Sequence, residues 1–194
     1  MPADPKDLQL RLAAATEKDT VRGMIFNGAI AAIRDVAGEQ ALRECLKHAG
    51  RDKFVDFFSY PVTEYLRLAW AAVERLEGKL GGVDPAFFKL GHQAVVSFID
   101  SHVGKTLVTL VSGDPKRLLA NAPTAYRTAV SYGERTVTWP GPKQCLISFK
   151  HDFLTHSFHE GVLTMGVTVM GGKEVKVTSR PVGFLEVDYE VAWA

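Results

Sequence analysis

The spacing of the apolar residues changes within residues 113–139, and this change constrains the fold more than any other feature. Before this segment, apolar residues recur every three or four positions, as on the buried face of a helix. After it they mostly alternate with polar residues, as on a half-exposed strand. The sequence therefore predicts an α+β fold, in which a helical layer is followed by an antiparallel sheet.

Residues 1–133 are predicted to be mainly helical, with about five to seven helices. Gly38 and Gly50 follow apolar stretches of helical spacing, and glycine commonly ends a helix. Two Asp-Pro pairs, at residues 84–85 and 114–115, are typical of helix starts, because aspartate caps the first turn and proline suits its first position. The helical part is thus divided into short, separately capped pieces.

Residues 134–194 are predicted to form about four antiparallel strands interrupted by one helix at about 153–170. The expected strands are residues 135–139, 144–150, 173–178 and 185–193, with a turn at 180–183. In the last strand, apolar residues alternate strictly with Glu186, Asp188 and Glu190. This row of acids could hold a metal, but alternation on a half-exposed strand favours a solvated face.

Composition places the chain among globular proteins with one sizeable core. The 194 residues are 46% hydrophobic and carry a formal charge of +1, so we predict a single domain, 1–194, and no nucleic-acid binding. No apolar run is long enough to span a membrane, and the N-terminus lacks the apolar core of a signal peptide, so the predicted location is cytoplasmic. Cys45 and Cys145 are isolated and predicted to be buried.

No catalytic motif is present in the sequence. There is no Gly-x-Ser-x-Gly, phosphate-binding or dinucleotide-binding pattern, and we predict no enzymatic activity. His156 and Glu160 are four residues apart, as helical zinc ligands can be, and His151 and His159 lie nearby. The pattern is not His-Glu-x-x-His, so His156, His159 and Glu160 are only weak metal candidates, and a role in opening the helix is favoured.

Several short segments together resemble an uncharacterised paralogous family known mainly from myxobacteria. They are residues 19–27, Pro61 with Tyr65-Leu66, Leu90-Gly91, Gly104-Lys105, residues 113–115 and residues 160–163. The family is similar in turn to a superfamily of haem-nitric-oxide-binding, 4-vinyl-reductase-like and TRAPP-subunit domains. This resemblance implies a helical layer on an antiparallel sheet, frequent dimerisation, and in several members a cavity for haem or an apolar ligand.

The residues that haem-binding relatives use are not reproduced in this chain. Those relatives carry Tyr-x-Ser-x-Arg and an axial histidine, whereas Tyr132 and Arg135 stand here with the wrong spacing. His92 and His102 would be the helical axial candidates. A lone histidine on an apolar helix face is more often a core residue, and we predict no cofactor.

Three functional hypotheses follow from these features. The leading one is a non-enzymatic regulatory or scaffolding module that acts through protein contacts, as a homodimer or with another protein. The alternative is a sensor that holds an apolar small molecule between helices and sheet. The third is a metal-dependent protein that uses the cluster between His151 and Glu160. The candidate contact residues are Phe54, Phe57, Phe58, Tyr60 and Trp70. The candidate ligand-binding residues are Phe58, Tyr65, Trp70, Phe88, His92, Tyr126, Tyr132 and Arg135.

Overall fold

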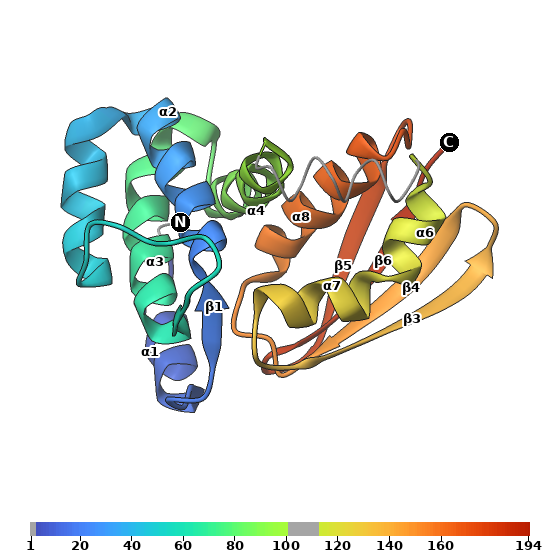
Figure 1. Cartoon of the computed structure of the whole chain (residues 1–194), viewed down its shortest axis with the longest axis horizontal. Coiled ribbons are helices and arrows are strands. Elements are labelled where there is room, and N and C mark those ends of the chain that lie inside the picture. The colour runs from blue at the N-terminus through green and yellow to red at the C-terminus, as the bar shows by residue number, and fades with distance from the viewer. Residues whose placement is uncertain (1–2, 101–112) are drawn as a thin grey trace.

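Four helices form a group at one end of the molecule in a computed structural model, which describes residues 3–100 and 113–194. These helices are α1 (Pro5–Ala14), α2 (Gly23–Ala49), α3 (Val62–Leu80) and α4 (Val83–Asp100). Figure 1 shows the sheet at the other end, and α4 is the member of the helical group that packs on α8. The predicted helical layer is therefore confirmed. A further predicted helix at 105–111 lies outside the described residues.

Two helices meet at Gly38 within α2, where the sequence predicts a helix end. Gly38 has φ 87°, a left-handed conformation that favours glycine, and the chain resumes as a helix directly after it. At its far end, Gly50 adopts φ 74° and closes the helix. The prediction that the first helix ends at Gly38 is therefore confirmed, and the two apolar stretches lie on two helices joined there by a kink.

A small two-stranded sheet was not predicted. β1 (Thr20–Arg22) pairs antiparallel with β2 (Ser59–Pro61), with Val21 opposite Tyr60. Each strand has three residues, which is too short for a period of two to be recognised. The pair places the start of α2 beside Phe58 and the start of α3 beside Asp19.

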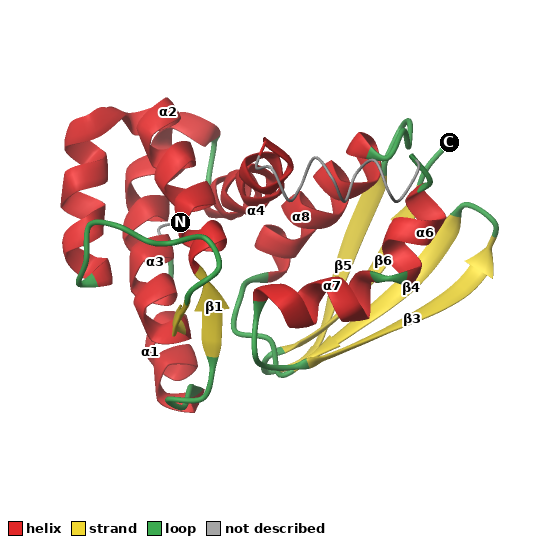
Figure 2. Ribbon diagram, in the orientation of Figure 1, coloured by secondary structure: helices red, strands yellow, loops and turns green. Residues whose placement is uncertain are grey.

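The main sheet has four antiparallel strands, as predicted (Figure 2). They are β3 (Glu134–Gly141), β4 (Gln144–Lys150), β5 (Lys176–Gly183) and β6 (Glu186–Ala192), in the order β3-β4-β6-β5. α8 (His156–Val169) packs on one face with α6 (Pro115–Ala120), and α7 (Ala122–Ala129) runs alongside β3. The side chains of the core between these helices and the sheet are Leu119, Cys145, Ile147, Phe149, Leu163, Val167, Tyr189 and Val191.

Two predicted boundaries in this part are wrong. Residues 180–183 continue strand β5 instead of turning, and Pro181 is tolerated there because β5 is an edge strand. α8 starts at His156, because Thr155 caps it by accepting a hydrogen bond from the Phe158 amide. The acidic face of β6 is polar, as expected: Asp188 accepts hydrogen bonds from Ser148 at 2.7 Å and Arg180 at 2.9 Å.

Both cysteines are buried, as predicted, and this gives a first testable expectation. Burial raises the pKa of the Cys45 and Cys145 thiols to about 11. At pH 8 only about one thiol in a thousand is then ionised, and the thiolate is the reactive form. We expect iodoacetamide to modify the folded chain at least about 100-fold more slowly than the urea-unfolded chain. Mass spectrometry of timed samples measures both rates, and equal rates would contradict the burial.

In the part of the chain that the structure describes, no helix is both long and apolar enough to cross a membrane.

Candidate functional site

Four polar side chains form a buried network where α7, α8 and the sheet meet. The Tyr126 hydroxyl lies 3.2 Å from His159 Nδ1, and His159 Nε2 lies 3.0 Å from Asp152 Oδ1. The other Asp152 oxygen accepts a hydrogen bond from Arg135 Nη2. Arg135, Asp152 and His159 are only 8%, 3% and 1% exposed. We call Tyr126, Arg135, Asp152 and His159 the buried network.

Aromatic rings enclose the guanidinium of Arg135. Its central carbon lies 5.0 Å from the ring centre of Tyr126, 5.2 Å from that of Phe149 and 5.7 Å from that of Tyr132. A cation over aromatic faces is stabilised by the ring quadrupoles. Arg135 also donates to the backbone carbonyl of Tyr132. The charge is therefore held by one carboxylate, one carbonyl and three rings.

Electrostatics within the network favour an ionised Asp152. Burial on its own would raise the pKa of this carboxyl, but His159 and Arg135 more than offset burial and hold the pKa at about 2. Burial also raises the pKa of Tyr126 and Tyr132 above the usual value, so both hydroxyls stay neutral. At neutral pH the network thus holds an ionised Asp152 between Arg135 and His159, with neutral phenols beside it.

Helices α4 and α8 approach each other to backbone contact beside the network. A Cβ at Gly91 would lie 1.8 Å from the Phe158 carbonyl oxygen, and one at Gly161 would lie 2.1 Å from the Phe88 carbonyl oxygen. Both distances are far below van der Waals contact, so only glycine fits at the crossing. The crossing joins the helical group to the sheet and its helices.

The structure separates the eight predicted ligand-binding residues into distinct places. Tyr126, Tyr132 and Arg135 come together in and beside the buried network. Tyr65 lies deeper, with its ring 6.1 Å from that of Phe158, and its buried hydroxyl has no hydrogen-bond partner among the described residues.

The other four candidates have partners outside the network. Phe88 and His92 are half-buried neighbours on α4, with ring centres 6.3 Å apart. Trp70 packs on Phe87 elsewhere in the helical group, and Phe58 is exposed.

Asp152 and the pairing of His159 were missed by the sequence reasoning. The residues 151–160 drew attention as a possible metal cluster, but spacing gives no sign that Asp152 reaches Arg135, 17 positions earlier. A lone buried acid carries no sequence signal, because its burial depends on the packing of α8 over the sheet. The only hint is an arginine inside an otherwise apolar strand face.

The three weak metal candidates point to different partners. His156 Nε2 lies 3.6 Å from Asp84 of α4, His159 belongs to the buried network, and Glu160 accepts a hydrogen bond from Ser179 of β5 at 2.6 Å. Within residues 3–100 and 113–194, no group of three or more potential ligands could hold a metal ion.

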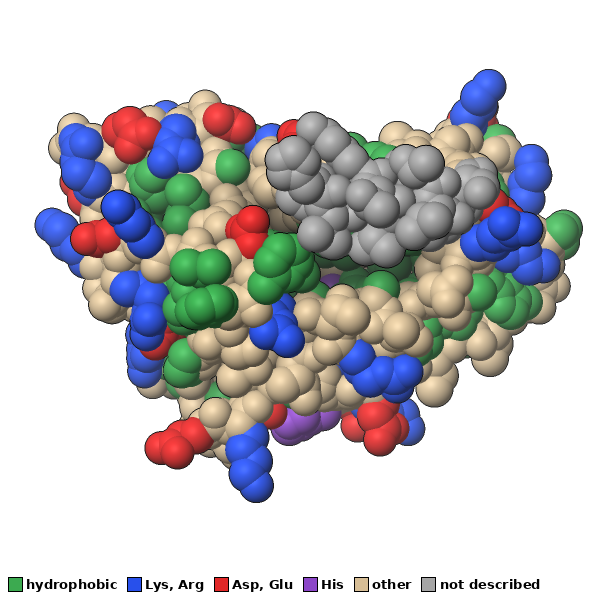
Figure 3. Space-filling model, viewed as in Figure 1, with side chains coloured by type: hydrophobic (Ala, Val, Ile, Leu, Met, Phe, Trp, Pro, Cys, Tyr) green, Lys and Arg blue, Asp and Glu red, His purple; other side chains and the backbone are tan. Residues whose placement is uncertain are grey.

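A second feature is the loop between α2 and β2, residues 51–58, which we call the aromatic loop. It exposes Val55 (54%), Phe57 (50%) and Phe58 (64%), which are large apolar side chains. Of the predicted contact residues, Phe54, Tyr60 and Trp70 are instead buried. On the face shown in Figure 3, hydrophobic side chains gather over the helical group where this loop runs. Such a cluster is a common mark of an interaction surface.

Hydrogen bonds from α2 fix the backbone of the aromatic loop. Its backbone accepts hydrogen bonds from the Gly23 and Met24 amides, at 2.9 and 3.0 Å, and from the Asn27 side chain at 3.1 Å. Phe54 stacks on Phe26 with ring centres 4.0 Å apart.

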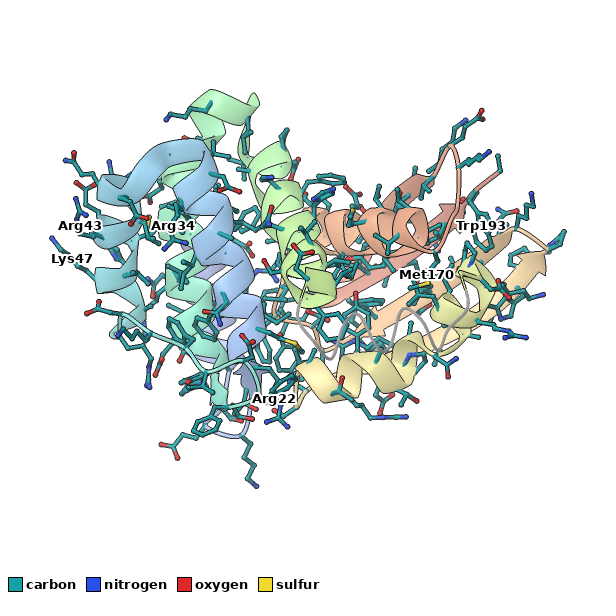
Figure 4. All side chains as sticks on the ribbon, turned by 45° about the horizontal axis from the view of Figure 1, so that its top comes forward. Arg22, Arg34, Arg43, Lys47, Met170 and Trp193 are labelled. Carbon is teal, nitrogen blue, oxygen red and sulfur yellow. The ribbon has the colours of Figure 1, made fainter. Side chains whose placement is uncertain are left out.

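Contacts to the start of α2 fix the loop further. Arg22 joins the Phe57 carbonyl of the loop to the Thr128 carbonyl of α7 and is labelled between these elements in Figure 4. A Cβ at Gly23 would lie 2.1 Å from the Val55 carbonyl oxygen, so the loop rests directly on the start of α2. The apolar side chains are thus presented by an ordered backbone.

Two hollows on the described part of the surface are lined by residues outside the buried network. One of about 520 Å³ lies between α1, α3 and the start of α8, beside Arg11, Trp70 and Asp84. The other, of about 330 Å³, lies between the aromatic loop and the end of α4 and is lined by Met24, Phe57 and Phe98 among others. Figure 4 shows side chains filling the space between the helices and the sheet.

Solved structures of H-NOX proteins share this fold. The chain is similar to the Fe(II) unliganded H-NOX protein from K. algicida, with 14% identity and a TM-score of 0.68 over 89% of this chain and 96% of that chain. It is also similar to an H-NOX protein from S. oneidensis in the Fe(II)NO ligation state, with 16% identity and a TM-score of 0.71 over 89% of this chain and 99% of that chain. At these identities the likeness shows the fold alone.

Sequence comparison agrees with the resemblance noted from the short segments. Among curated proteins no sequence matches the chain. A family profile, described as a protein of unknown function (DUF2378), matches residues 14–194, which is nearly the whole chain. The chain therefore belongs to the DUF2378 family.

Proposed function

We propose that this chain is a non-enzymatic regulatory or scaffolding module that acts through protein contacts, and that the aromatic loop forms a homodimer contact. The observation that carries this proposal is the exposure of Val55, Phe57 and Phe58 on an ordered backbone. An ordered loop loses little conformational entropy on binding, and buried aromatic side chains supply much of the energy of protein interfaces.

The charges of the loop favour a second copy of the chain as the partner. Its ionisable residues are Arg51, Asp52, Lys53 and Asp56, two of each sign. A two-fold contact places a surface patch against itself, so a patch with both signs can pair and a patch with one sign would repel. Arg51 is already paired with Glu64 and Asp56 with Asn27. The exposed Lys53 and Asp52 are therefore the residues that would pair across the two-fold axis.

The likeness to H-NOX structures raises the question of haem, but the described residues do not form a site that would hold it. The axial candidate His92 is held neutral, since burial lowers its pKa, and its Nδ1 has no described hydrogen-bond partner. A neutral ring could bind iron, but the backbone of His92 is packed against α8 at the α4–α8 crossing. A Cβ on Gly161 of α8 would lie 2.8 Å from the backbone nitrogen of His92. Arg135 is already paired with Asp152. The other candidate, His102, lies outside the described residues, and the proposed contact needs no haem.

The two alternatives have less support in the described part of the chain. A sensor for an apolar molecule would need an enclosed space between helices and sheet, where side chains of the buried network and its aromatic neighbours pack instead. A metal-dependent function would need His156, His159 and Glu160 to converge, whereas they bind different partners. A cytoplasmic location and a lack of enzymatic activity remain predictions.

Sedimentation equilibrium of loop variants tests the proposed dimer. We expect the wild type to form a dimer and Phe57→Ser/Phe58→Ser to weaken it at least about 100-fold, because truncating two central aromatic anchors costs about 3 kcal/mol or more. The matched control is Val182→Ser/Phe184→Ser at the β5–β6 turn, where the side chains are equally exposed, at 51% and 53%. This control should dimerise like the wild type.

A charge exchange adds a second test of the same contact. Asp52→Lys alone should weaken the dimer, because position 52 would then carry a positive charge that faces the positive charge of Lys53 of the partner subunit. The double variant Asp52→Lys/Lys53→Asp should restore it. A wild type that stays monomeric at millimolar concentration would refute the dimer, and a dimer that survives the loop substitutions would place the contact on another surface.

A further inference from the structure

Arg135 is a buried charge that needs a counter-ion inside the protein. Its side chain is 2% exposed and that of Asp152 is 3% exposed, and the two are joined by an ion pair. Taking either charge out of water alone costs several kcal/mol, so a buried charge without a partner is strongly destabilising. The sequence supplies that partner from the loop between β4 and α8, immediately before the helix that packs on the sheet.

The remaining contacts of Asp152 hold its carboxylate toward Arg135. Oδ1 accepts from the Leu154 amide at 2.9 Å and lies 3.0 Å from His159 Nε2, while Oδ2 faces Arg135. His159 in turn lies within hydrogen-bond distance of the Tyr126 hydroxyl. A His159 with its hydrogen on Nε2 donates to Asp152 and accepts from Tyr126, which satisfies both ring nitrogens. Both oxygens of the carboxylate are therefore bound by protein groups.

We infer that Asp152 is a built-in counter-ion for Arg135, and that this chain keeps the fold of the haem-associated H-NOX structures as a haem-independent protein. Among the described residues, Asp152 neutralises Arg135 and three aromatic rings enclose its guanidinium, so Arg135 needs no bound acidic cofactor as its counter-ion.

Titration of the purified full-length chain with haemin tests haem independence. We expect no sharp Soret band to develop at one equivalent, and no rise of the melting temperature with added haemin. Protein expressed with a haem precursor should likewise be isolated without a Soret band. A stoichiometric Soret band with an accompanying rise in melting temperature would overturn the inference.

A double-mutant cycle tests the counter-ion directly. Arg135→Met and Asp152→Leu each leave one buried charge without its partner, and each should lower the melting temperature by about 10 °C. Arg135→Met/Asp152→Leu replaces both charges with apolar side chains and should recover at least half of the summed loss. If a single variant does not fold, a folded double variant still demonstrates the coupling.

The more exposed pair Arg180–Asp188 provides the control, since the Arg180 side chain is 76% exposed and that of Asp188 is 17% exposed. Arg180→Met and Asp188→Leu should each change the melting temperature by no more than about 4 °C. Losses at Arg135 and Asp152 as small as these, or losses that simply add in the double variant, would show that Asp152 is not the counter-ion.

Discussion

Gly91→Ala is expected to lower the free energy of unfolding by about 3 kcal/mol or more, although alanine is the better helix former. The added methyl group would lie 1.8 Å from the Phe158 carbonyl oxygen, which belongs to the backbone of α8 and cannot rotate away. Relief requires α4 and α8 to move apart, which loosens packing along the whole crossing. Urea unfolding followed by circular dichroism measures the change.

Gly78→Ala is the matched control for this substitution. Gly78 is also inside a helix, α3, but a Cβ there meets nothing within 4 Å. Alanine should therefore raise the free energy of unfolding by about 0.5–1 kcal/mol. Gly161→Ala should behave like Gly91→Ala, because its Cβ would lie 2.1 Å from the Phe88 carbonyl oxygen. If all three variants were equally stable, α4 and α8 would not be in backbone contact.

Acid should destabilise the chain through Asp152 in a defined pH range. The pKa of this carboxyl falls from the ordinary value of 3.8 to about 2 in the folded protein. A lowered pKa stabilises the fold above the ordinary pKa, and this stabilisation is lost as the pH falls from about 4 to 2. At 1.36 kcal/mol for each pKa unit, the loss from this one group is about 2 kcal/mol.

Unfolding of the wild type and Asp152→Asn by urea at pH 5, 4, 3 and 2 tests this expectation. The wild type should be clearly more stable at pH 5, and the difference between the two proteins should shrink by about 2 kcal/mol by pH 2. Asp188→Asn is the control at an ion pair whose arginine is 76% exposed, so that solvent weakens the interaction. A difference between wild type and Asp152→Asn that stays constant with pH would show that Asp152 is not ionised in the fold.

The regular spacing of apolar residues along the sequence made most of the fold predictable. Residues 185–193 alternate strictly, and the structure buries Tyr189 and Val191 on one face of β6 while Glu190 stays exposed. The helices were recognised in the same way, because long amphipathic segments carry the strongest local signal. The similarity to haem-nitric-oxide-binding domains is confirmed at the level of fold, whereas that to 4-vinyl-reductase-like and TRAPP domains stays a prediction.

Features that depend on distant segments could not be predicted in the same way. β1 and β2 are three residues each, and they pair although the whole of α2 separates them in the sequence. The Arg135–Asp152 pair joins a strand to a loop, and neither residue looks unusual in its own neighbourhood. The sequence likewise grouped the aromatics around residues 54–60 without indicating that Phe54 and Tyr60 would turn inward while Phe57 and Phe58 stay outside.

The exposed aromatic side chains of the loop make a protein contact the central claim. Two variants that each carry one added cysteine for a spin label test it most directly. The native Cys45 and Cys145 are buried and should stay unlabelled. Ser59→Cys places a label beside Phe58, and Thr178→Cys places one on the exposed face of strand β5. Both positions are exposed, so either label can be attached without disturbing the core.

Double electron–electron resonance then measures the distance between labels on two subunits. A dimer formed through the aromatic loop predicts a short, well-defined distance for Ser59→Cys and a longer one for Thr178→Cys. The Phe57→Ser/Phe58→Ser substitutions should abolish both signals. No intermolecular coupling from Ser59→Cys at millimolar concentration, or a shorter distance from Thr178→Cys than from Ser59→Cys, would contradict the proposed contact.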